Sequence, residues 1–236
     1  MRFRRRPAEC AADRQVVWQA SSLLLAYPDD AFTQRMGLVA AAVADLPGRA
    51  GELLRDCVNR LIALDPLAAA VGYVDTFDWR RRRTLFLTYY TAGDTRNRGV
   101  ALLEFATAYR SAGAIPPAGE LPDHLAVVLE FAATVDSDAG FALLAAHRAP
   151  IDLLIDGLRK MDSPYAPAVE AVAATLPAPT ENDLLTARRL AMQGPPAEAV
   201  GLDPYPTAGA TPGRVARPGP VDLQLTPRIP AGRGSS

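Results

Sequence analysis

The sequence predicts an all-α fold, in which a single-domain bundle of many helices precedes a disordered C-terminal tail. Three observations support this. Alanine, leucine and arginine dominate, while aromatic residues make up only 7% of the chain, so helix formers outweigh residues that favour sheets. Apolar residues recur at helical spacing from Val16 to Met192. Prolines and glycines interrupt this spacing at regular intervals, as expected between helices.

The first three predicted helices each end near a proline or glycine. In the first, the apolar stripe ends where Tyr27 precedes Pro28, because proline disfavours helical geometry in the residue before it. The next two end before LPGRAG and before Asp65-Pro66. The expected ranges are 16–27, 32–43 and 53–64.

A fourth helix should start at Pro66 with Asp65 as its cap. We expect it to continue, with or without a bend, through the arginine-rich segment as far as Gly93-Asp94. A helix over about 99–111 follows, and then the loop SAGAIPPAGELP. Asp123 is predicted as the N-cap or a first-turn residue of the next helix, which runs to Val135.

The remaining elements complete one helical domain. Three or four more helices are predicted, over the ranges 138–147, 150–161, 164–176 and 181–193. Residues 195–236 hold nine of the 21 prolines and six of the 17 glycines, without a periodic apolar pattern, so they cannot bury enough surface to order themselves. The predicted organisation is a flexible basic arm (1–12), a helical domain (13–193) and a disordered tail (194–236).

Charge and cysteine content exclude several classes of protein. The net charge of −1 provides no field for attracting nucleic acid, and arginine supplies 24 of the 25 positive charges, which we interpret mainly as genome composition. Cys10 and Cys57 lie far apart, without a CxxC motif, which favours a reducing cytoplasm. The arginines of MRFRRR lack a following apolar region, so we expect a solvated arm here rather than an export signal. No apolar run is long enough for stable membrane insertion.

The run from Arg80 to Arg83 has two interpretations. On a helix these four side chains fan around nearly the whole circumference, which favours solvated charges paired locally with Asp78 over a basic stripe for DNA. A helical DNA-binding regulator therefore stays only as a weak alternative, testable by salt dependence. On the same expected helix an aromatic face with an arginine is typical of a partner interface. Its members are Trp79, Arg83, Phe86 and Tyr90.

Neither of the two segments that resemble catalytic motifs predicts an enzyme. Asp123 and His124 have no GxSxG motif or reactive cysteine motif beside them, and His147 is the only other histidine, so the sequence offers no nucleophile and no metal ligand set. In TAGDTRNRG the glycines lack the spacing of a phosphate loop. By its residues alone, His124 is a partly buried histidine after a capping aspartate, and Arg96 and Arg98 are exposed loop charges.

Two segments resemble the NarJ family, whose members are cytoplasmic chaperones that assemble respiratory nitrate reductase. These are DTFDWRRRRTLFLTYYTAGDTRNRG from Asp75 and ELPDHLAVVLEF from Glu120, and the resemblance extends over roughly residues 15–193. It implies the helical bundle of NarJ, TorD, DmsD and related redox-enzyme maturation chaperones. It also implies a client-binding groove near the acidic-proline-Asp-His motif and the end of TAGDTRNRG. The residues it assigns to partner binding are Glu120, Pro122, Asp123, His124, Arg98 and Gly99.

The function implied by this resemblance is that of a system-specific chaperone. It binds the N-terminal segment of the nitrate reductase catalytic (alpha) subunit, and keeps this client competent for molybdenum cofactor insertion before membrane assembly. The molybdenum bis-guanine-dinucleotide cofactor and the iron–sulfur clusters belong to the client, and proteins that deliver the cofactor are a second class of partner that the resemblance allows. A chaperone for another molybdoenzyme, of the dimethyl sulfoxide or trimethylamine oxide reductase type, is the alternative within the class.

Overall fold

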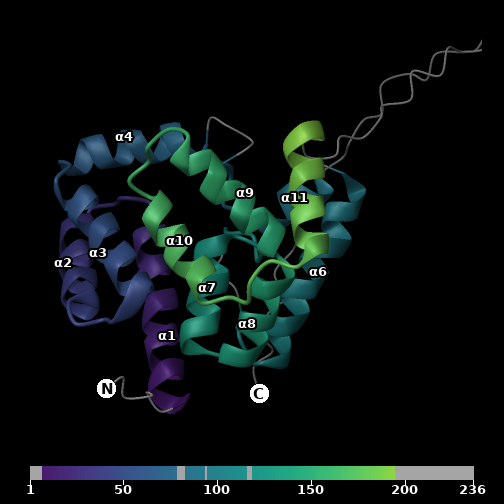
Figure 1. Cartoon of the computed structure of the whole chain (residues 1–236), viewed down its shortest axis with the longest axis horizontal. Coiled ribbons are helices and arrows are strands. Elements are labelled where there is room, and N and C mark those ends of the chain that lie inside the picture. Colours follow the sequence, from purple (N-terminus) through teal and green to yellow (C-terminus); the bar gives the residue numbers. More distant parts are fainter. Residues whose placement is uncertain (1–6, 79–82, 94, 116–118, 195–236) are drawn as a thin grey trace, which may run out of the picture. The chain divides into compact units, whose positions relative to one another are not determined.

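The computed structural model describes residues 7–78, 83–93, 95–115 and 119–194, and within these residues the fold is all-α (Figure 1). The described residues contain no β-strand, only one isolated bridge between Phe86 and His124. The helices are α1 (Pro7–Leu24), α2 (Phe32–Val43), α3 (Gly48–Ile62), α4 (Pro66–Phe77), α5 (Leu87–Ala92), α6 (Arg96–Ser111), α7 (Leu125–Thr134), α8 (Ser137–Ala146), α9 (Arg148–Arg159), α10 (Ala166–Ala174) and α11 (Glu181–Gln193).

Helix α1 is central to the core, because it packs against α2, α3, α7 and α10 (Figure 1). Trp18 is completely buried, and its indole Nε1 donates a hydrogen bond to Thr175 Oγ1 at 2.9 Å. Two buried serines on the next turn donate to main-chain carbonyls of other helices: Ser21 to Ala168 in α10 and Ser22 to Ala126 in α7. Polar side chains buried in this way need such partners, so they fix how the three helices fit together.

Several predicted helix boundaries are confirmed. The α2 and α11 ranges agree with the sequence prediction, and α4 begins at Pro66 with the Asp65 carboxylate accepting hydrogen bonds from two main-chain N–H groups. Other helices start earlier than the apolar stripe indicated, at Gly48 for α3 and at Arg96 for α6. Helix α1 begins at Pro7, so residues 7–12 are helical although they fall in the predicted arm. The rest of that arm and the predicted tail from residue 195 onward lie outside the described residues.

The prediction of one helix from Pro66 to Gly93 was wrong. Helix α4 ends at Phe77, Phe86 is in extended conformation, and the short helix α5 then ends at Gly93, whose φ of +59° favours glycine. The end of α4 is closed by Arg83, whose Nε donates to the Thr76 carbonyl at 3.0 Å. Consequently Arg83, Phe86 and Tyr90 do not share one helical face, and Trp79 lies outside the described residues.

Aromatic rings attach α4 to the core. Tyr73 and Phe77, one turn apart, both contact the ring of Tyr165, with centroid distances of 5.8 and 5.1 Å. The Tyr73 hydroxyl also donates to the Leu25 carbonyl at 3.0 Å, just after α1. These contacts fix the C-terminal half of α4 against the residue after α1 and the residue before α10.

No single helix of the described chain has both the length and the hydropathy needed to cross a bilayer. Helices α3 and α4 meet these criteria only as a pair, and they are bent by 119° relative to one another. Much of α3 is buried in the core of the bundle, including Leu54, Cys57 and Leu61, and core helices commonly satisfy the same test.

Candidate functional site

Two segments that are distant in sequence come together as short extended stretches in front of α5 and α7. Phe86 and His124 form an antiparallel bridge. The Leu125 N–H donates to the Leu85 carbonyl at 2.8 Å, and the Leu87 N–H donates to the Asp123 carbonyl at 3.1 Å. The two quoted segments of the resemblance therefore meet at this bridge.

Asp123 faces the core and caps a helix other than the one predicted. Its side chain is 0% exposed, and its Oδ2 accepts hydrogen bonds from Thr88 N at 3.0 Å and Thr88 Oγ1 at 2.6 Å. Thr88 lies in the first turn of α5, where unpaired N–H groups favour a carboxylate. The N-cap of α7 is His124, without a side-chain hydrogen bond to that helix, so the prediction that Asp123 begins α7 was wrong.

Further contacts fix the loop before α7. The Tyr109 hydroxyl on α6 donates to the Pro122 carbonyl at 2.6 Å. The Glu120 carboxylate accepts from the Leu121 N–H at 3.1 Å. The acidic-proline-Asp-His motif is thus held by α5 on one side and by α6 on the other, which presents His124 in a defined position.

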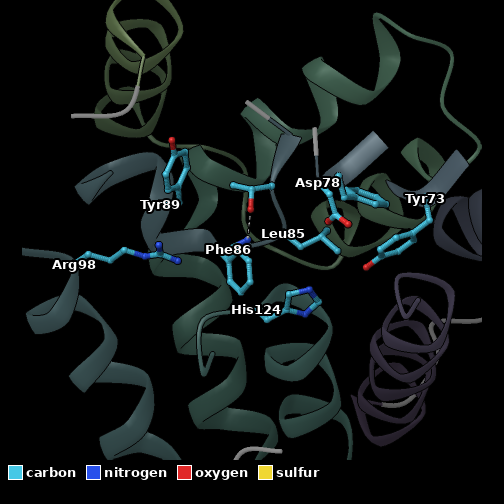
Figure 2. A pocket seen from close by; sticks show the side chains of 9 residues that line it. Tyr73, Asp78, Leu85, Phe86, Tyr89, Arg98 and His124 are labelled. Atoms are coloured by element: carbon cyan, nitrogen blue, oxygen red, sulfur yellow. Dashed lines mark hydrogen bonds between the residues drawn. The ribbon is translucent and has the colours of Figure 1, made fainter. Parts of the chain in front are cut away.

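A cavity of about 290 Å³ lies beside the bridge (Figure 2). Four regions of the chain contribute to its wall: the end of α4, the segment before α5 with α5 itself, the start of α6, and the residue preceding α7. Aromatic rings form much of the wall, and the His124 ring packs edge-to-face on Phe86 at a centroid distance of 5.2 Å. The lining residues are Tyr73, Phe77, Asp78, Thr84, Leu85, Phe86, Tyr89, Arg98 and His124.

Opposite charges flank this aromatic wall. In Figure 2 Arg98 enters from one side and Asp78 from the other, with Phe86 and His124 between them. The Arg98 guanidinium lies over the rings of Phe86 and Tyr89, at 5.4 and 5.7 Å from their centroids. Stacking of this kind orients the guanidinium while its edge can still donate hydrogen bonds. Arg98 is half-buried in the first turn of α6, so its prediction as an exposed loop charge was wrong.

The environment of His124 favours the neutral form of its imidazole. Burial lowers the pKa of its imidazole, and the nearby negative charges of Glu120, Asp123 and Asp78 oppose this shift without reversing it. Among the described residues, neither His124 Nδ1 nor Asp123 Oδ1 has a hydrogen-bond partner. Asp123 is committed to Thr88, so the two neighbours do not form the oriented acid–base pair that nucleophilic catalysis requires.

The remaining predicted site residues fall into two groups. Glu120 and Pro122 lie in the loop that carries His124, and Gly99 is exposed beside Arg98, with open space where a Cβ would be. Arg83 and Tyr90 instead line a second cavity of about 220 Å³, together with residues of α9 and α11. Tyr90 is buried, and its hydroxyl donates to the Thr84 carbonyl at 3.0 Å.

Sequence reasoning did not single out several residues of the cavity wall. Helical spacing alone makes core residues of Tyr73, Phe77 and Tyr89, and each of them is largely buried. Only the bridge between distant segments reveals that one side of each ring faces a cavity. Their only sequence signal was their position within or next to the first segment quoted for the resemblance.

Groups that could bind metal or act as nucleophiles are scarce in the part of the chain that is described. No cluster of three or more histidine, cysteine or acidic side chains suited to a metal ion occurs among those residues. Cys57 is buried, and burial raises the pKa of its thiol to about 12, so the reactive thiolate is suppressed. At the cavity itself, aromatic rings lie between Arg98 and Asp78, an arrangement that suits binding of an amphipathic group.

Comparison with known proteins identifies the family. Residues 43–171, more than half of the chain, match the family described as nitrate reductase delta subunit. The nitrate reductase-like protein NarX of Mycobacterium tuberculosis is 52% identical over 160 residues, covering 68% of this chain and 24% of NarX, so the chain spans about a quarter of that relative. The Bacillus subtilis protein named probable nitrate reductase molybdenum cofactor assembly chaperone NarJ is 32% identical over 165 residues, covering 70% of this chain and 90% of that protein.

A third relative agrees with these two. The Escherichia coli K12 protein named nitrate reductase molybdenum cofactor assembly chaperone NarJ is 32% identical over 148 residues, covering 61% of this chain and 63% of its own length. The family match includes the bridge and every residue of the cavity wall from Tyr73 to His124. The chain therefore belongs to the NarJ family, the nitrate reductase delta subunit family.

Proposed function

We propose that this protein is an assembly chaperone that binds the N-terminal segment of a nitrate reductase catalytic (alpha) subunit. The observation that carries the proposal is the cavity beside the Phe86–His124 bridge, where aromatic rings lie between Arg98 and Asp78. Aromatic rings with an arginine are typical anchors for peptide side chains, and an amphipathic helix can insert its apolar side into such a site. The names of the Bacillus subtilis and Escherichia coli relatives support the choice of client.

The proposed action is to keep the client open for cofactor insertion before it assembles at the membrane. The molybdenum cofactor and iron–sulfur clusters belong to the client, and the chaperone acts in the cytoplasm without a cofactor of its own. A cavity of about 290 Å³ that combines aromatic rings with a few polar and charged groups favours moderate affinity, and hence release once the client is complete. Proteins that deliver the cofactor are the further partners in this proposal.

A binding experiment with matched variants tests the proposal. The purified chain is mixed with the nitrate reductase catalytic subunit of the same organism, with and without its N-terminal segment, and with a peptide of that segment. We expect binding only when the segment is present. Arg98→Ala should weaken binding about tenfold or more, because it removes both the cation and its stacked ring contacts. Arg110→Ala is the control, since Arg110 lies on the same helix at its exposed end.

The experiment also distinguishes the alternative client. A dimethyl sulfoxide reductase catalytic subunit serves as the competitor, and tighter binding to it would assign the chain to that branch. Equal binding of the nitrate reductase subunit with and without its N-terminal segment would contradict the proposal. The same holds if Arg98→Ala and Arg110→Ala bind the peptide equally well.

A further inference from the structure

Exposed apolar side chains occur at the junction of α3 and α4, at the opposite end of α4 from the cavity. Large apolar side chains with substantial exposure cluster within ten positions here, and Leu67 and Val71 are 73% and 54% exposed. Single exposed apolar residues are ordinary on protein surfaces, but a contiguous group of them marks an interaction surface. The cluster consists of Ile62, Leu64, Leu67 and Val71.

Helix geometry connects this surface to the cavity. With about 100° per residue, positions 67, 71, 74 and 78 fall within a narrow stripe along α4. Ala69, Tyr73 and Phe77 point to the core side and are buried. The stripe therefore runs from exposed Leu67, past half-buried Val74, to Asp78 in the cavity wall.

We infer that the client-binding site extends from the cavity along this stripe of α4, and that a helical apolar segment of the client covers it. The inference rests on the proposed function and adds the course of the bound segment. Leu67 and Asp78 are separated by eleven residues, or about 16 Å along the helix axis. A client helix of similar length can therefore cover the stripe while its end inserts between the aromatic rings of the cavity.

The charges along α4 specify the chemistry of the occupant. Within Pro66–Phe77 the only charged side chain is Asp75, which is exposed, and Asp78 follows at the cavity. The occupant should therefore be apolar toward Leu67 and Val71, with a cationic side chain where it passes Asp75 and Asp78. An acidic peptide would place like charges together at this end of the stripe.

The test uses the full chain and a peptide of the first ~24 residues of the catalytic subunit, which spans about 36 Å as a helix. The double substitution Leu67→Ser and Val71→Ser should weaken binding of this peptide about ten- to a hundredfold, because it removes two aliphatic side chains that the bound peptide would bury. Leu38→Ser is the control, since Leu38 on α2 is similarly exposed, at 64%. A photo-cross-linking residue at position 71 should also capture the peptide, and one at position 38 should not.

The outcomes separate this inference from the proposed function. Unchanged affinity of the Leu67/Val71 double variant, together with weakened binding by Arg98→Ala, would overturn the extension and leave the proposed function intact. If neither Arg98→Ala nor the Leu67/Val71 double variant weakens peptide binding, both the proposed function and its extension along α4 are wrong. If sedimentation shows a dimer of the wild-type chain that the double variant loses while its peptide affinity is unchanged, the stripe is an interface between copies and the inference is wrong.

Discussion

Asp123 and His124 are neighbours in the chain, but their side chains point in opposite directions. The backbone here is extended, with φ −64° and ψ 125° at His124, and successive side chains of an extended segment alternate between its two sides. Asp123 consequently faces the start of α5, and His124 faces the cavity. A double substitution of this pair would combine two effects, so each residue needs its own variant.

Asp123→Ala should lower the free energy of unfolding by about 2–4 kcal/mol, because it leaves the buried N–H and hydroxyl of Thr88 without their acceptor. Asp65→Ala is the matched control. Asp65 also accepts two hydrogen bonds at the start of a helix, but it is exposed, so water can replace it and we expect a loss of about 1 kcal/mol. Urea unfolding followed by circular dichroism gives both values. Equal decreases in the free energy of unfolding of the two variants would show that the burial of Asp123 does not add to its contribution to stability.

The lowered pKa of His124 predicts a dependence of stability on pH. The unfolded chain gains a proton on this residue as the pH falls through about 6.5, whereas the folded chain gains it only at lower pH. Acid therefore favours the unfolded state. Between pH 7.5 and 5.5 the wild type should lose up to about 1 kcal/mol more stability than His124→Gln.

Paired urea titrations at the two pH values check this, and subtraction of the two proteins cancels the contribution of other titrating groups. A larger loss in His124→Gln than in the wild type would indicate that the neighbouring carboxylates, rather than burial, dominate the imidazole.

At the scale of helices, arginine side chains close C-terminal ends. Arg55 Nη1 donates to the carbonyls of Val43 and Leu46 at 2.9 and 2.8 Å, just where α2 ends, and Arg83 does the same at the end of α4. Arg148 donates to the Pro177 carbonyl at 2.6 Å, beyond α10. Carbonyls at these ends lack partners within their own helix, and a guanidinium with several donors satisfies more than one. The arginine content therefore has a structural use in addition to any bias of the genome.

Helices α7 and α8 approach each other closely at Gly140. A Cβ at this position would collide with the backbone and side chain of Ala132, so Gly140→Ala should cost about 1–3 kcal/mol through displacement of the two helices. Gly37→Ala is the control. Gly37 is also inside a helix, but it faces open space, so alanine there should stabilise the protein by about 0.5–1 kcal/mol. The melting temperature should fall for Gly140→Ala and rise for Gly37→Ala. An unchanged melting temperature for Gly140→Ala would mean that α7 and α8 can move apart at no cost in free energy.

At the scale of the molecule, the candidate site depends on contacts between parts of the chain that are distant in sequence. Its wall combines α4, α5, α6 and the residue before α7, and α4 in turn depends on Tyr165, which precedes α10. A cavity assembled in this way is preorganised only in the complete bundle. Any variant that separates α4 from the core should therefore also lose the proposed client binding.

The proposed function makes a prediction for the cell. Without this protein, the nitrate reductase polypeptides should still be made, but the catalytic subunit should accumulate without molybdenum cofactor and with low activity. Cofactor synthesis should continue, so a different molybdoenzyme in the same cells should keep its activity. Metal analysis of the purified catalytic subunit and activity staining of both enzymes measure this. Full cofactor occupancy in the deletion strain would refute an assembly role.

The sequence by itself determined the helical class and much of the helix order, because apolar periodicity, capping residues and glycine or proline breaks act over a few neighbouring residues. It predicted the start of α4 at Pro66 and the ranges of α2 and α11, and the two quoted segments identified the family. Only the tertiary structure decided that α4 ends at Phe77 and that Phe86 is extended before α5. The start of α5 is stabilised by Asp123, which lies 35 residues after Thr88. The cavity followed from the same long-range pairing, which brings Phe86 to His124 and turns the rings of Tyr73 and Tyr89 into parts of one wall. Apolar periodicity cannot predict such pairing, because it indicates which face of a helix is buried but not which distant segment covers that face.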